Sequence, residues 1–159
     1  MKTRKEFLES VMQMVDLKDM HKADIATQAV ASLTKLIVGD ELSQKIATSL
    51  LPDLRKGWDS ISIRSLVLMK SGVLPIMKTR KEFLEAVMKM AYLKDVKEAD
   101  KVSRAVISLM KFLIGDELSQ KIADVSPPDL REGWESIRAA QADHFESDEL
   151  LFETGEVEE

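Results

Sequence analysis

Apolar residues recur every three or four positions along most of the chain, a spacing typical of amphipathic helices. The clearest series starts in residues 3–15, where Phe7, Leu8 and Val11 fall on one face of a helix. Thr3 and Glu6 stand three positions apart just before this series, which is the pattern of a capping box. We therefore predict an all-α fold whose first helix begins at Thr3.

The same spacing predicts three more helices before residue 62. A second helix runs from about Lys22 to Val38, and Gly39 is suited to end it in a left-handed conformation. Asp40 is suited to start the third helix, and Pro52 favours the first turn of a fourth. The expected buried residues of these three helices are Ala26, Ala29, Val30, Leu33, Leu36 and Ile37, then Leu42, Ile46 and Ala47, then Leu54, Trp58 and Ile61.

The whole pattern occurs twice. Residues 1–61 align without a gap onto residues 77–137, with 39 of the 61 positions identical. Each repeat is close to the size at which a lone hydrophobic core is marginal. We therefore predict two tandem four-helix units, residues 1–61 and 77–141, that pack together about a pseudo-twofold axis.

Two segments stand outside the repeat. Residues 62–76 are largely apolar, and we expect them to prolong the fourth helix and then to form a packed linker. Beyond the second repeat, helix is expected to continue to about residue 142. Residues 142–159 form an acidic tail that contains eight Asp and Glu residues and no Lys or Arg. Its charge makes docking on a basic part of the body a testable expectation.

One stretch of each repeat resembles a known family. The Leu-Pro-Asp-Leu-Arg run at 51–55 follows a Gly-Asp-Glu helix junction and precedes Trp58. This arrangement resembles the small bacterial helical domains catalogued as domain-of-unknown-function family 2267, over residues 3–61 and 79–137. The resemblance implies an all-helical fold that can occur in tandem. It implies no established activity, so it supplies no functional residues, and Pro127 in place of leucine departs from the pattern.

Composition narrows the chemistry. The absence of cysteine excludes disulfides, thiol catalysis and thiolate metal sites. No apolar run approaches the roughly 20 residues that span a bilayer, and the first residues lack the apolar core of a secretion signal. A cytoplasmic location without membrane association is the default expectation. The two histidines, His21 and His144, have no histidine at the equivalent repeat position, so we expect no metal site and no cofactor.

Two kinds of residue recur as candidates for interaction. Arg and Trp are enriched at binding hot spots, although core packing is the favoured interpretation of the tryptophans. Cations at a helix start oppose the helix dipole, and a bound anion would compensate for them. The candidate interaction residues are Arg55, Trp58, Arg131 and Trp134, with the basic helix starts Lys2, Arg4, Lys5, Lys78, Arg80 and Lys81.

These observations favour a non-catalytic helical interaction or adaptor protein, with a regulatory role left open. Its expected partner is another protein, and self-association is also left open. A first alternative is an anion- or nucleic-acid-associated protein that uses the basic helix starts, but a nucleic-acid surface is usually more basic and more aromatic. A second alternative is an uncharacterised enzyme, whose sign would be a convergent polar pocket with perturbed carboxylates.

Overall fold

The computed structural model of the chain describes residues 2–61 and 77–140, and every regular element in these ranges is an α-helix. The predicted all-α class is therefore confirmed. The extension and linker expected at 62–76 and the acidic tail expected at 142–159 lie outside the described residues. The helices are α1 (Arg4–Val15), α2 (Met20–Ser49) and α3 (Pro52–Ser60), followed by α5 (Arg80–Met90), α6 (Val96–Val125) and α7 (Pro128–Ser136).

Local sequence starts the helices much as predicted. The Thr3 hydroxyl accepts a hydrogen bond from the Glu6 amide at 3.1 Å, and the Glu6 carboxylate accepts one from the Thr3 amide at 3.1 Å. The same capping box starts α5. The second helix begins at Met20, two residues before the expected Lys22, because the Asp19 carboxylate accepts a hydrogen bond from the His21 amide at 2.9 Å.

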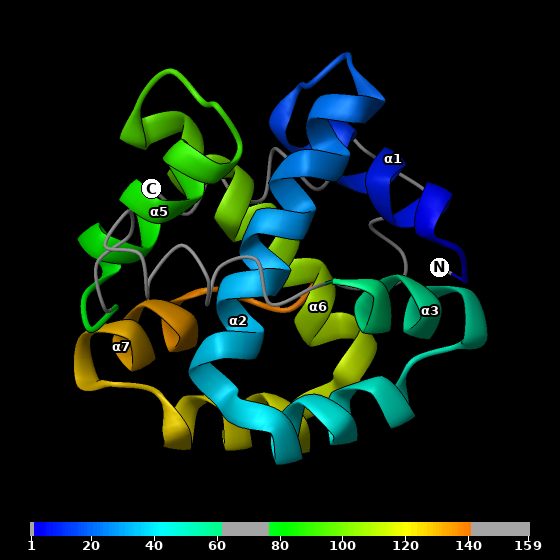
Figure 1. Cartoon of the computed structure of the whole chain (residues 1–159), viewed down its shortest axis with the longest axis vertical. Coiled ribbons are helices and arrows are strands. Elements are labelled where there is room, and N and C mark those ends of the chain that lie inside the picture. Colours follow the sequence, from blue (N-terminus) through cyan, green and yellow to red (C-terminus); the bar gives the residue numbers. More distant parts are fainter. Residues whose placement is uncertain (1, 62–76, 141–159) are drawn as a thin grey trace.

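The two long helices are bent where the sequence predicted an end. Gly39 has φ 83° and ψ 171°, and Gly115 has φ 85° and ψ 169°. This is an extended conformation of positive φ that is open to glycine, and it differs from the left-handed helical conformation expected for a cap. The helical dihedral angles are interrupted at each glycine, so the predicted second and third helices are both present, as the two arms of the element labelled α2. In Figure 1 the long arm of α2 crosses the middle of the molecule and the short arm turns along its base toward α3.

Helices α2 and α6 pack against each other at the centre of the molecule, and α1 and α5 each contact both of them. One hydrophobic cluster includes buried residues of both repeats. Because α2 has neighbours on several sides, Ala31, Ser32 and Thr34 are buried in addition to the predicted face. The largest fully buried side chains are Leu33, Ile46, Val11 and Val30, with Leu109, Ile122, Val87, Val102 and Val106 in the second repeat.

The corner before the short helix is the same in both repeats. Leu51 has φ −67° and ψ 156°, and Pro127 has φ −58° and ψ 152°. Proline is restricted to a φ near −65°, which is the value this position already requires. The replacement of leucine by proline therefore leaves the corner unchanged.

The second repeat ends earlier than the sequence predicted. Helix was expected to continue to about residue 142, but α7 ends at Ser136 and residues 138–140 are not helical. The Ser108 hydroxyl of α6 donates to the Arg138 carbonyl at 2.8 Å, and the Ala140 amide donates to the Ser108 carbonyl at 3.0 Å. These contacts with α6 take the backbone groups that a continued helix would use. None of the helices in the two described ranges combines the length and the apolar character needed to cross a bilayer.

Candidate functional site

Two cavities of about 80 Å³ each lie at equivalent positions in the two repeats. The first cavity lies among α1, α2 and α3, and the second among α5, α6 and α7. Apart from Val106 and Ser136, each lining residue of one cavity has its repeat counterpart in the other. Each cavity is completed by the other repeat: Met110, Leu113 and Ile114 of α6 line the first, and Thr34, Ile37 and Val38 of α2 line the second.

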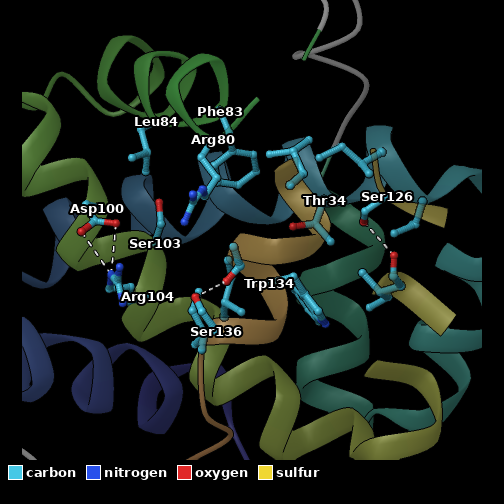
Figure 2. A pocket seen from close by; sticks show the side chains of 17 residues that line it. Thr34, Arg80, Phe83, Leu84, Asp100, Ser103, Arg104, Ser126, Trp134 and Ser136 are labelled. Atoms are coloured by element: carbon cyan, nitrogen blue, oxygen red, sulfur yellow. Dashed lines mark hydrogen bonds and ion pairs between the residues drawn. The ribbon is translucent and has the colours of Figure 1, made fainter. Parts of the chain in front are cut away.

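The walls of the second cavity are mainly apolar. Phe83 and Leu84 reach it from α5. Ile107 contributes from α6 and Trp134 from α7. Figure 2 shows Phe83, Leu84 and Arg80 extending from α5 toward Ser103 and Trp134. Small-ligand sites likewise combine apolar walls with polar groups. The polar and charged lining residues here are Thr34, Arg80, Asp100, Ser103, Arg104, Ser126 and Ser136.

Each cavity contains one buried hydroxyl without a hydrogen-bond partner. Among the described residues, these are Thr27 Oγ1 and Ser103 Oγ, which occupy equivalent repeat positions. The Ser103 side chain belongs to a residue that is only 3% exposed. Helical Ser and Thr can donate to the carbonyl four residues earlier, as Thr34 does to Val30 at 2.8 Å. Thr27 and Ser103 make no such bond, so each cavity has an unused hydrogen-bonding group.

Arginine side chains stand at the mouths of both cavities, but their partners differ. In the first, Arg4 Nη2 donates to Asp24 Oδ1 at 2.6 Å. In the second, the equivalent Asp100 accepts hydrogen bonds from Nε of Arg104, at 3.1 Å to each carboxylate oxygen. The first repeat has Gln28 at the position equivalent to Arg104. Only the second aspartate, Asp100, can therefore bind an arginine of its own helix.

Because Asp100 is engaged, Arg80 takes other partners. Its Nε lies 3.5 Å from Asp129 Oδ1, and its Nη2 lies 3.6 Å from Glu132 Oε1. Position 132 corresponds to Lys56 in the first repeat, where no carboxylate is offered. The differences Gln28/Arg104 and Lys56/Glu132 between the repeats therefore change the partner of the equivalent arginine. Arg4 pairs with the long helix α2, whereas Arg80 pairs with the short helix α7.

The amides at the basic helix starts are already used. The Arg4 amide donates to Asp53 Oδ2 at 2.7 Å, and the Arg80 amide donates to Asp129 Oδ2 at 2.7 Å. This carboxylate ties the short helix to the start of α1 or α5, and it gives the Pro-Asp-Leu-Arg run a structural role. The bond spans 49 residues, so only the recurrence of the aspartate in both repeats could have pointed to it.

Glu6 occupies further amides of the first helix start. Hydrogen bonds from the Lys2 and Thr3 amides lower the pKa of the Glu6 carboxyl. Glu82 does the same in the second repeat, where the hydrogen bond from the Lys78 amide is the main cause of its lowered pKa. The lysines beside these amides are exposed at positions 2, 5, 78 and 81. The predicted anion site at each helix start therefore meets carboxylates supplied by the protein itself.

Trp58 and Trp134 are both buried, each 7% exposed, as the core-packing interpretation predicted. Their Nε1 atoms donate to the Ser43 carbonyl at 3.1 Å and to the Ser119 carbonyl at 3.0 Å. Trp58 and Trp134 are thus wall residues of the two cavities, and their role in binding a partner stays a prediction.

The neighbouring arginines are exposed and pair with carboxylates on their own short helices. Arg55 Nε is 3.8 Å from Asp59 Oδ2, and Arg131 Nε is 3.2 Å from Glu135 Oε2. Both side chains are about 45% exposed, so they remain accessible to a partner.

Two lysines that the sequence analysis missed cap the short helices. Lys35 Nζ donates to the Ile61 carbonyl at 3.1 Å, and Lys111 Nζ donates to the carbonyls of Trp134 and Ile137. A cation is favourable at this end of a helix. The available signal was the recurrence of lysine at the same place in both apolar stripes.

The same lysines also lie over the cavity tryptophans. Lys35 Nζ is 5.1 Å from the centre of the Trp58 ring, and Lys111 Nζ is 5.0 Å from that of Trp134. These distances are within the range of cation–π attraction. Burial lowers the pKa of both lysines, and a nearby carboxylate, Asp59 or Glu135, partly opposes the effect.

In residues 2–61 and 77–140, no group of three or more His, Asp or Glu side chains is placed to hold a metal ion. His21 is exposed. Comparison with protein-family models, with curated proteins and with solved structures finds no match to this chain. The resemblance to domain-of-unknown-function family 2267 stays a prediction.

Proposed function

We propose that the protein is a non-catalytic helical interaction module, with two tandem four-helix units related by a pseudo-twofold axis. The observation that carries this proposal is the pair of equivalent cavities, each completed by the long helix of the other repeat. In this proposal each cavity accepts an apolar group of another protein, and the module acts in the cytoplasm.

Equivalent contacts in the two repeats support this reading. Helix α1 contacts α6 as α5 contacts α2, and α3 packs on α2 as α7 packs on α6. If the bend at Gly39 and the bend at Gly115 are each counted as a helix boundary, each repeat contains four helical segments. A protein with two equivalent sites can engage two groups of one partner, which raises the overall affinity without new contacts.

The anion-binding alternative is favoured less by the geometry. Its four lysines are exposed, but the Arg4 and Arg80 amides beside them already donate to Asp53 and Asp129. Retention on nucleic acid that persists at physiological salt would revive this alternative, because phosphate contacts are strongly salt-dependent.

Affinity capture with cavity-filled variants tests the proposed function. The full chain is immobilised as wild type, as Thr27→Leu with Ser103→Leu, and as Tyr92→Ser. Tyr92 is 76% exposed and lines neither cavity, so it is the matched surface control. We expect a partner that binds the wild type and the control and is lost from the filled variant. Equal capture by all three folded proteins would contradict the proposal.

A further inference from the structure

We infer that the second cavity binds a carboxylate carried on a short apolar group, whereas the first cavity accepts the same apolar group without preferring the charge. This inference rests on the proposed function, because it assumes that the cavities are binding sites. It goes further by assigning different ligand head groups to two sites that share one design.

The size of the cavities limits the ligand. A volume of about 80 Å³ is several times what one water molecule needs, which is roughly 10–15 Å³ on the same kind of measure. It is well below the roughly 300 Å³ at which sites for drug-sized ligands begin. A short aliphatic chain therefore fits, with its head group toward the exposed mouth.

Ser103 supplies the first polar contact. Its hydroxyl is buried, lines the cavity and has no partner in the described chain. Buried polar groups in native proteins nearly always have a partner. An oxygen of a bound ligand would provide one, because the hydroxyl can donate to it. The equivalent Thr27 hydroxyl offers the same contact in the first cavity.

Arg104 supplies the charge that distinguishes the second cavity. Asp100 binds its guanidinium through Nε, and within residues 2–61 and 77–140 the terminal nitrogens have no hydrogen-bond partner, so they can donate to a ligand. Its side chain is 56% exposed, so it lies at the mouth where a carboxylate head would emerge. Charge-assisted hydrogen bonds between arginine and carboxylate are stronger than those between neutral groups.

The first cavity lacks this donor. The neutral Gln28 stands where Arg104 stands in the second. Arg4 of the first cavity donates to Asp24 through Nη2 at 2.6 Å, much as Arg104 donates to Asp100 through Nε, so the difference between the cavities is the additional arginine. The charged residues that line the first cavity are one arginine and one aspartate, while two arginines and one aspartate line the second. Arg80 of the second cavity is already paired with Asp129 and Glu132, and Glu132 stands where the first repeat has Lys56, so we assign the preference for an anionic head group to the direct contact with Arg104 alone.

The ligand chemistry has two possible sources. A free short-chain acid presents a carboxylate on an apolar chain, and so does the carboxyl end of a protein whose last residue is apolar. Both would place the apolar group against Phe83 and Trp134 and the carboxylate near Ser103 and Arg104. The experiment below separates them.

Tryptophan fluorescence allows each cavity to be measured separately in the full-length protein. The Trp58→Phe variant retains Trp134 in the second cavity, and the Trp134→Phe variant retains Trp58 in the first. Each is titrated with hexanoate and with 1-hexanol at pH 7. We expect hexanoate to bind about tenfold more tightly than hexanol at the second cavity, and the two to bind alike at the first.

Exchanging one residue between the repeats is the matched control. Arg104→Gln places the residue of the first repeat in the second, and we expect it to abolish the preference for hexanoate at Trp134. Gln28→Arg should create a preference at Trp58. Ser103→Ala should weaken hexanoate binding at the second cavity about fivefold to tenfold by removing the buried donor.

A tetrapeptide ending in leucine, with a free or an amidated carboxyl end, separates the two sources. Tighter binding of the free-acid peptide than of hexanoate supports a protein chain end, and the reverse order supports a small acid. Equal affinity of hexanoate and hexanol at Trp134, unchanged by Arg104→Gln, would overturn the inference while leaving the cavities as binding sites. No response of either tryptophan to any probe would also overturn it, and the capture experiment would then decide the proposed function separately.

Discussion

At the scale of single residues, the hydroxyls of Thr27 and Ser103 distinguish the cavities from ordinary core packing. Both are buried without a partner at equivalent positions of a duplicated sequence. Burying such a group costs roughly 1–3 kcal/mol by mutational measurements. Two buried hydroxyls without partners in one small protein are expected where a bound ligand offsets this free-energy cost.

Removing these hydroxyls should therefore stabilise the ligand-free protein. We expect Thr27→Val and Ser103→Ala each to raise the free energy of unfolding by about 1 kcal/mol, measured by chemical denaturation. Ser108→Ala is the control, because that hydroxyl is also buried but donates to the Arg138 carbonyl at 2.8 Å. It should lose stability by about 1 kcal/mol or more. Destabilisation by the first two variants would show that their hydroxyls have partners after all.

Sequence predicted those residue roles that depend on near neighbours. The Thr3–Glu6 capping box was readable because its two residues stand three positions apart. Asp53 and Lys35 were not readable, because their partners lie 49 and 26 residues away. The lack of a hydrogen-bond partner for the Ser103 hydroxyl depends on all the helices packed around it. No local sequence pattern could have predicted it.

At the scale of elements, the bends at Gly39 and Gly115 direct the short arms of α2 and α6. The sequence predicted that one helix ends and another begins at these glycines, and the structure has two helical arms around each bend; the left-handed conformation expected for the glycine is wrong. The sequence also predicted helix beyond Arg138, where local propensity is overridden by hydrogen bonds between residues 138–140 and Ser108. Helix type was thus predictable from spacing, while its continuation depended on tertiary contacts.

Replacing Gly39 by alanine tests the bend. An added Cβ at Gly39 would meet no atom within 4 Å, so the cost comes only from the backbone conformation at φ 83°. We expect Gly39→Ala to lower the free energy of unfolding by about 1–3 kcal/mol.

Gly57→Ala is the control within a regular helix. There the added Cβ would lie 3.8 Å from Arg4 Cδ, an ordinary contact. We expect a gain of up to about 1 kcal/mol from helix propensity. The equivalent Gly133→Ala should gain less, because its Cβ would lie 2.5 Å from Arg80 Cδ and force that side chain to move. Equal changes for Gly39→Ala and Gly57→Ala in thermal or chemical denaturation would argue against the strained bend.

At the scale of the whole molecule, the duplication produces a shared core and two cavities that each repeat completes for the other. The ungapped repeat and the small size of each copy predicted packing between them. They could not predict that Thr34, Ile37 and Val38 would line the cavity of the second repeat, because this follows from how α2 lies on α6. The central claim is that the two repeats form one cooperative unit around these cavities.

Denaturation of the Trp58→Phe protein, with and without Leu54→Ala, tests that claim most directly. Trp134 fluorescence then reports the second repeat, while Leu54→Ala weakens the first by roughly 2–5 kcal/mol because Leu54 is buried. Coupled repeats should show one transition, with the midpoint of Trp134 fluorescence falling together with that of the far-ultraviolet circular dichroism. A Trp134 midpoint that stays unchanged while the circular dichroism splits into two transitions would contradict the account.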